Sequence, residues 1–224
     1  MLRFESNDPH RHRRVAPTLT TAMPTHSPAA TDDTLRTLRR ELRARRRAVP
    51  RDARRRAARL LAWRVESAGW LTAGRRIALF LSMPEEIDTA PLLARARARG
   101  CQVFVPRITD YRHSRMRFLP LTGALRRGNF GILEPGTGIA RGARDMDVVF
   151  MPLVGFDARG NRIGMGKGYY DRALSFRRHA PHYRHPLLVG LAFECQRVEH
   201  LPVRPHDIAL DCLVTESGTR RFPS

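Results

Sequence analysis

The stretch Met151–Leu174, which reads MPLVGFDARGNRIGMGKGYYDRAL, constrains the fold of this chain more than any other. The apolar run at its left edge, Val148–Met151, is typical of a buried strand, and its right end favours a helix. Glycines at 155, 160, 164, 166 and 168 separate the two. Because glycine turns freely and leaves backbone N–H groups unshielded, this order predicts a cradle for an anion such as phosphate at the helix start.

Lys167 lies inside this loop and is the only lysine among 41 basic residues. An ammonium kept where every other cation is arginine indicates a need for a compact charge on a flexible stem. Chance is the alternative, since one lysine must fall somewhere. The loop has neither the P-loop spacing nor the dinucleotide-binding fingerprint. We interpret its glycines, Lys167, the tyrosines that follow and Asp171 as one functional site.

The remaining chain alternates short apolar runs with helical periodicity. Buried strands are predicted at 77–81, 101–106, 147–151, 187–193 and 210–214, and helices at 34–48, 52–68, 89–99 and 169–176. A right-handed crossover should make the first two strands parallel neighbours. Residues 116–119 are a weaker strand candidate, and residues 120–145 are expected to form a loop over the site. The pattern predicts an open, mostly parallel α/β sheet with helices on both faces, a single domain with an N-terminal helical segment.

Composition sets the limits of that domain. Residues 1–33 lack apolar periodicity and are expected to be a disordered leader, with the α/β domain at 34–218 and a C-terminal tail at 219–224. No run approaches the length of a membrane span, so we expect no membrane partner. The three cysteines, Cys101, Cys195 and Cys212, lack metal-ligand spacing, which favours buried thiols in a reducing, cytoplasmic setting.

The net charge of +20 would ordinarily suggest a nucleic-acid partner. The arginines of residues 36–59 could follow a phosphate backbone, so an Arg-rich nucleic-acid-binding protein on an α/β scaffold is the alternative function. Against it, these helices lack interleaved aromatic residues and no recognition motif is present. The positive charge is spread along the chain, and arginine is used in place of lysine almost throughout. Both observations favour a general compositional bias over a nucleic-acid-binding surface.

Acidic residues follow the first predicted strand. Glu85 and Glu86 lie where ligands bind in open α/β sheets, beyond the carboxyl end of a strand. They could equally place negative charge at the N-terminus of the next helix, and both roles can hold. Glu86 could also serve as the nucleophile of a sugar-phosphate isomerase or CoA transferase on the same scaffold, although Lys167 and the aspartates would then have no role. Asp207, from the residues alone, favours an ordinary surface charge or turn.

The run PLVGFDARGNRIGMGKGYYDRAL resembles the signature of the 5-formyltetrahydrofolate cyclo-ligases, also called 5,10-methenyltetrahydrofolate synthetases. Three further matches occur in order: Leu38–Arg39, the segment FLSMPEEIDT at 80–89, and the spacing of Pro202, Asp207 and Asp211. Together they span about residues 34–216. The resemblance implies conversion of 5-formyltetrahydrofolate to 5,10-methenyltetrahydrofolate, with ATP and Mg²⁺ as cofactors and small molecules as the only partners.

The resemblance also implies roles for individual residues. Lys167 and Arg39 would be catalytic, Asp171 and Asp207 would bind Mg²⁺, and Leu81 and Glu86 would contact the folate. The residues implied in ATP binding are Arg36, Arg39, Arg162, Ile163, Gly164, Met165, Gly166, Lys167, Gly168, Tyr169 and Tyr170. The folate would also contact Met165, Gly166, Lys167, Gly168 and Tyr169.

One position departs from the family pattern. Leu35 stands where the family has a basic residue, and Arg36 is the candidate substitute. Tyr170 could equally pack in the core. A monomer is our expectation, but the sequence leaves open the oligomeric state, the preference for polyglutamate, whether residues 1–22 are translated, and which arginines bind the glutamate tail.

Overall fold

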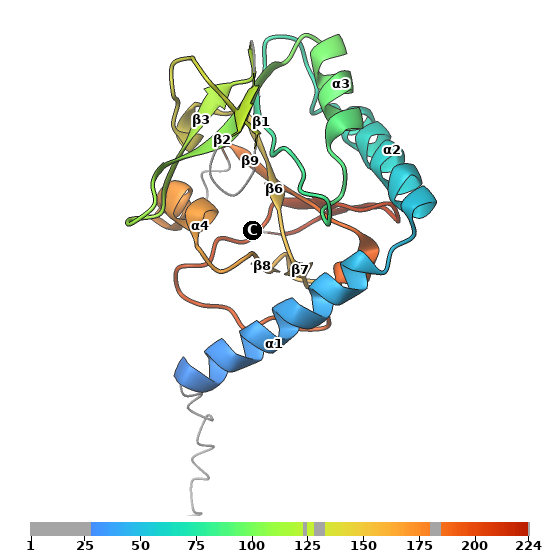
Figure 1. The fold of residues 1–224 in the computed structure, drawn as a ribbon, viewed down its shortest axis with the longest axis vertical. Helices are drawn as coiled ribbons and strands as arrows, with labels where there is room; N and C mark the ends of the chain where they lie inside the picture. The colour runs from blue at the N-terminus through green and yellow to red at the C-terminus, as the bar shows by residue number, and fades with distance from the viewer. Residues whose placement is uncertain (1–27, 123–124, 128–132, 180–184, 224) are drawn as a thin grey trace, which may run out of the picture.

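The computed structural model describes residues 28–122, 125–127, 133–179 and 185–223. Its centre is a seven-stranded sheet in the order β11-β10-β9-β6-β1-β2-β3 (Figure 1). The five inner strands, from β10 to β2, are parallel, and the edge strands β3 and β11 are antiparallel to their neighbours. The strand bounds are β1 Arg76–Ala78, β2 Gln102–Asp110, β3 Arg115–Pro120, β6 Val148–Pro152, β9 Leu187–Leu191, β10 Cys212–Val214 and β11 Thr219–Arg221.

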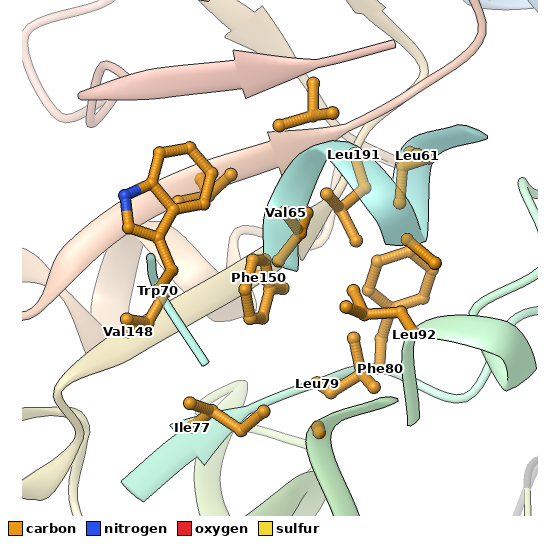
Figure 2. Close-up of a cluster of buried hydrophobic side chains, with 14 of the residues drawn as sticks. Leu61, Val65, Trp70, Ile77, Leu79, Phe80, Leu92, Val148, Phe150 and Leu191 are labelled. Atoms are coloured by element: carbon orange, nitrogen blue, oxygen red, sulfur yellow. The ribbon is translucent and has the colours of Figure 1, made fainter. Parts of the chain in front are cut away.

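Helices cover both faces of the sheet, as predicted. On one face α2 (Arg51–Ser67) and α3 (Ala90–Ala98) bury Leu61, Val65 and Leu92 against Phe150 of β6, as Figure 2 shows. On the other face α4 (Tyr169–Ala173) and the 3₁₀ helix Ser175–His179 pack with Leu174 against the side chains that β6 and β9 turn that way. Strands covered on both faces read as continuous apolar runs, which is why they were recognisable.

The long helix α1 (Pro28–Arg47) does not lie on either face but runs across the carboxyl ends of the parallel strands (Figure 1). Its buried stripe, Leu35 and Leu42, packs against Val154 and Ile163, which follow β6. At Gly155 a Cβ atom would lie only 2.4 Å from Leu42 Cδ1, so any larger residue here would have to displace the buried Leu42 side chain. This docking brings the N-terminal segment to the edge where ligands of α/β sheets bind.

Between β6 and α4 the chain forms a small hairpin, β7 (Gly155–Phe156) paired with β8 (Arg162–Ile163). Asp157 closes its turn: the buried carboxylate accepts hydrogen bonds from the backbone N–H groups of Arg159 and Asn161 and from the Asn161 amide. The glycine loop, residues 164–168, therefore leaves a fixed hairpin and enters α4 directly.

Several boundaries differ from the prediction. Helix α1 begins at Pro28, ahead of the predicted 34. The polar residues at 31–33, which in the sequence resemble N-caps of a helix beginning at 34, therefore lie within it. Residues 1–27, the rest of the expected leader, lie outside the described residues. The expected loop at 120–145 carries the hairpin β4 (Leu125–Arg127) and β5 (Leu133–Pro135) and a 3₁₀ helix, Ala143–Asp145.

The C-terminal segment differs as well. Residues 219–224 were expected to be a tail, but 219–221 form edge strand β11. Its residues are exposed or half-buried on both sides, so the strand has no apolar pattern to reveal it. In the residues that the structure describes, no helix combines the length and the apolar character needed to cross a membrane.

Candidate active site at the glycine loop

The glycine loop lies at the carboxyl ends of the strands, beside α1 and ahead of α4 (Figure 1). Gly166 has φ +93°, a left-handed conformation that side chains other than glycine rarely adopt. A Cβ atom on Gly166 would lie 3.5 Å from Arg39 Cζ, so the guanidinium rests against this backbone. Met165 and Lys167 are exposed, whereas Gly164 and Gly168 are half-buried, so the middle of the loop faces outward.

Arg39 is the residue that joins α1 to this loop. Its Nε donates a hydrogen bond to the Gly164 carbonyl oxygen at 2.9 Å, across 125 positions of sequence. Burial lowers the pKa of Arg39, and the negative charge of Asp207 opposes that effect. Helix α1, the glycine loop and the Asp207 segment therefore meet at one guanidinium.

Arg36 is placed differently. Its guanidinium pairs with Asp33 on the exposed side of α1 at 2.7 Å, with 77% of its side chain accessible. Of the two arginines implied in nucleotide binding on this helix, the structure brings Arg39 to the loop and leaves Arg36 pointing away from it.

The Lys167 side chain is exposed, and within the described residues no hydrogen bond or ion pair holds it. Its carbonyl oxygen accepts a hydrogen bond from the Arg172 guanidinium, which also lies against Gly168. The backbone of the loop tip is thus fixed while the ammonium stays free. A fixed backbone that carries an unpaired ammonium is the arrangement expected of a residue that binds an anionic ligand.

The two aspartates implied in metal binding lie on segments that touch. Asp171 Oδ1 pairs with Arg162 Nη2 at 2.6 Å and accepts a hydrogen bond from the backbone N–H of Ile208 at 3.2 Å. Asp207, the residue before Ile208, accepts a hydrogen bond from the N–H of Arg204 at 2.8 Å. The contact of α4 with the 204–208 turn therefore places Asp171 against the residue that follows Asp207.

These two carboxylates fit a magnesium ion in chemical type. Mg²⁺ prefers hard oxygen donors and is commonly held by one or two carboxylates together with phosphate oxygens and water. Among the described residues there is no cluster of three or more acidic, histidine or cysteine side chains that could form a closed metal cage. The protein share of such a site is thus limited to an open pair.

Glu86 and Tyr170 are two partly buried ionisable residues whose charges influence each other. Burial raises the pKa of Glu86, although its carboxylate accepts a hydrogen bond from the N–H of Met83 at 3.0 Å. Burial also raises the pKa of the Tyr170 phenol, and the charge of Glu86 raises it further. The Tyr170 hydroxyl is buried without a hydrogen-bond partner among the described residues, so core packing alone leaves a polar atom unsatisfied. Leu81 packs at the edge of the α2–α3 core, and Tyr169 is half-buried.

Glu85 has a role that the sequence did not reveal. It accepts hydrogen bonds from Arg43, Arg46 and Arg47 of α1 at 3.2–3.3 Å and so ties this helix to the β1–α3 loop. Burial alone would raise the pKa of Glu85, but the arginines lower it. Its carboxylate is therefore engaged with α1, away from the helix N-terminus that we expected it to charge. The pairing also removes three arginines from the basic face that the nucleic-acid alternative requires.

Comparisons with known proteins agree with this geometry. The sequence profile of the 5-formyltetrahydrofolate cyclo-ligase family matches residues 31–216. A mouse (Mus musculus) protein named 5-formyltetrahydrofolate cyclo-ligase is 34% identical over 193 residues, covering 82% of this chain and 94% of that protein. The protein of the same name from Escherichia coli K12 is 34% identical over 184 residues, covering 79% and 97%. The NMR structure of Aquifex aeolicus 5,10-methenyltetrahydrofolate synthetase is similar with a TM-score of 0.73 at 29% identity, covering 85% and 93%.

Proposed function

Because this chain belongs to the 5-formyltetrahydrofolate cyclo-ligase family, we propose that it converts 5-formyltetrahydrofolate and ATP into 5,10-methenyltetrahydrofolate, ADP and phosphate. The observation that carries this proposal is the hydrogen bond from Arg39 to Gly164, which joins α1 to the glycine loop beside Asp207.

The glycine loop supplies the nucleotide site. Backbone N–H groups of residues 164–168, the Lys167 ammonium and the Arg39 guanidinium would surround the phosphates, since phosphoryl transfer depends mostly on positioning and charge neutralisation. Lys167, on a flexible stem, would follow the γ-phosphate as charge moves from the attacking oxygen to the leaving group. Arg39 is held by Gly164 and would keep its position throughout.

Asp171 and Asp207 would hold the magnesium ion that accompanies the nucleotide. When bound, the ion supplies neutralisation of phosphate charge and a fixed geometry for the transferred group. The Arg162 guanidinium forms an ion pair with the same carboxylate and so neutralises Asp171 from the buried side. Its position in the hairpin would keep Asp171 oriented while the exposed oxygen faces the ligand.

In the reaction, the formyl oxygen of the folate attacks the γ-phosphorus of ATP, and the bond between the γ-phosphorus and the bridging oxygen breaks to release ADP. N10 of the folate then attacks the activated formyl carbon and loses its proton. Cleavage of the bond from that carbon to the phosphorylated oxygen releases phosphate and leaves the methenyl bridge between N5 and N10. Each step uses groups of the substrates themselves, so no protein nucleophile is required.

Glu86, Tyr170 and the loop residues Met165–Tyr169 would position the folate. The carboxyl group of Glu86, whose pKa is raised by burial, would exchange hydrogen bonds with the pterin. The unpartnered Tyr170 hydroxyl would find its partner in the same ligand, and the half-buried Tyr169 ring offers an aromatic face. Leu81 would contact the folate from the end of the first strand segment.

The test is direct. Purified protein is incubated with 5-formyltetrahydrofolate, Mg²⁺ and ATP, and the near-ultraviolet absorbance of methenyltetrahydrofolate is followed beside a reaction without ATP. Growth of the absorbance only with ATP supports the proposal, and equal traces reject it. We further propose a cytoplasmic location, because all three cysteines are free thiols. A monomer stays our expectation from the sequence. A gel-shift at physiological salt that retained nucleic acid specifically would support the alternative function instead.

A further inference from the structure

A groove of about 480 Å³ opens between the first turn of α2 and the β1–α3 loop. One wall carries Arg51, Arg54 and Arg55, and the other carries Ser82, Glu86 and Asp88. Glu86 lines this groove, and it is also the residue proposed to contact the pterin of the folate. Through Glu86, the groove adjoins the proposed pterin site.

Arg54 is part of the framework of this groove. Its guanidinium donates hydrogen bonds to the carbonyl oxygens of Arg46, Pro84 and Glu86 at 2.7–3.0 Å. Its Cζ also lies 5.0 Å from the centre of the Phe193 ring. Because its donors are used in this way, Arg54 fixes the distance between the two walls.

Arg51 and Arg55 differ from Arg54. Both are exposed, and within the described residues neither has a hydrogen bond or an ion pair. Four positions apart in the first turn of α2, they share one face of the helix and add to the positive end of its dipole. Three arginines of α1 pair with Glu85. By contrast, the guanidinium groups of Arg51 and Arg55 have no carboxylate partner among the described residues.

The opposite wall does not neutralise them. The Glu86 carboxylate is occupied by the N–H of Met83 at 3.0 Å, and Asp88 accepts a hydrogen bond from the N–H of Ala90 at 2.9 Å. Both acids are thus engaged within their own loop. The lining holds three cations against two acids, so a ligand with carboxylates is favoured along the α2 wall.

We propose that this groove binds the glutamate tail of the folate substrate, with Arg51 and Arg55 as its carboxylate contacts. The inference rests on the proposed function and extends it, since it concerns the end of the substrate that takes no part in the chemistry. A pterin held at Glu86 leaves the benzoyl-glutamate end to run outward, and each γ-linked glutamate adds one carboxylate. Guanidinium groups match carboxylates in geometry and can bind them in bidentate pairs.

The test compares substrates that differ only in the tail: 5-formyltetrahydropteroate without glutamate, the monoglutamate, and a γ-linked triglutamate. Arg51→Ala and Arg55→Ala should each raise KM for the triglutamate about 2- to 5-fold, the range for exposed ion pairs, with KM for the tail-less substrate and for ATP unchanged. Arg59→Ala is the matched control, because Arg59 is exposed on the next turn of α2 and does not line the groove. The difference should shrink as salt is raised.

Calorimetric titration with the same folates in the absence of ATP should rank the Kd values in the same order. Equal KM and Kd for all three tails, or equal effects of Arg59→Ala and Arg51→Ala, would overturn the inference even if turnover is normal. An effect on KM for ATP alone would assign the groove to the nucleotide and overturn it as well. Absence of turnover with every folate would reject the proposed function, while the titrations would still report on the groove.

Discussion

Arg162 and Asp171 form an ion pair at the centre of the site, with Nη2 at 2.6 Å from Oδ1 and only 4% and 18% of their side chains exposed. The same carboxylate oxygen accepts the hydrogen bond from Ile208. Hairpin β7–β8, helix α4 and the turn that carries Asp207 are therefore joined through one carboxylate. The Nε atom of Arg162 is buried without a partner among the described residues, so the pair has no second acid to share its charge.

Replacing Arg162 with methionine should destabilise the protein by about 2 kcal/mol, because it leaves Asp171 charged and half-buried; the value is below that of a fully buried pair. Adding Asp171→Asn should restore part of that loss. Urea unfolding of both single variants and the double variant measures the coupling between the two side chains. Additive losses would show that the pair contributes nothing beyond its separate parts.

Arg39→Ala should weaken ATP binding about 10- to 100-fold, the range expected when a charged hydrogen-bond donor is lost at a phosphate. Arg40→Ala is the control, because Arg40 is the next residue of α1 and is exposed without a partner in the described chain. Nucleotide titration by calorimetry distinguishes them. Equal affinities for the two variants would remove Arg39 from the nucleotide site.

Asp171→Asn should raise the Mg²⁺ concentration needed for half-maximal binding with ADP by about tenfold or more, since a neutral amide is a weaker ligand than a carboxylate. Glu199→Gln, at a carboxylate whose side chain is 91% exposed, controls for a general change in charge. Magnesium titrations in the presence of ADP provide the measurement. An unshifted curve would count against Asp171 as a ligand.

Glu86 should make stability depend on pH. Its folded-state pKa is raised, above all by burial, so the folded protein binds the proton more tightly than the unfolded chain does. Below the unfolded pKa both states are protonated and the group has no effect. As pH rises through the raised pKa, ionisation in the folded protein costs stability. Wild type should therefore lose stability relative to Glu86→Gln between acid and neutral pH, measured by urea unfolding at several pH values. A constant difference would show that the carboxyl is not perturbed.

Much of the sheet was predictable because its parallel strands are buried on both faces. The β1–α3–β2 unit and the strand before the glycine loop were recognised from short apolar runs, and the structure confirms the parallel order. Strand β11, with arginines at two of its three positions, was not recognised, because an exposed edge strand has no apolar signature. Helix α1 began earlier than predicted, since the polar residues before Leu35 resembled caps.

The residues of the candidate site could be proposed from the sequence, but the contacts between them could not. The glycine loop and Lys167 could be identified from spacing and composition. Two contacts depend on how helix α1 docks: the hydrogen bond from Arg39 to Gly164, and the pairing of Glu85 with three arginines of α1. Such contacts join residues far apart in the sequence, and neither charge nor periodicity indicates which arginine meets which acid. The hydrophobic stripe of α1 could place the helix against the core but not select the loop that it crosses.

Turnover by Lys167→Ala tests the central claim most directly, because the account assigns phosphate neutralisation to the single lysine of the sequence, whose side chain has no partner among the described residues. The rate of methenyltetrahydrofolate formation should fall about a hundredfold or more, the range seen when an enzyme loses one hydrogen-bond donor to the charge that develops in the transition state. The unfolding midpoint should stay unchanged. Lys167→Arg should recover only part of the rate, and Arg159→Ala, at an exposed residue of the β7–β8 turn, should leave it intact. Wild-type turnover by Lys167→Ala would contradict the account.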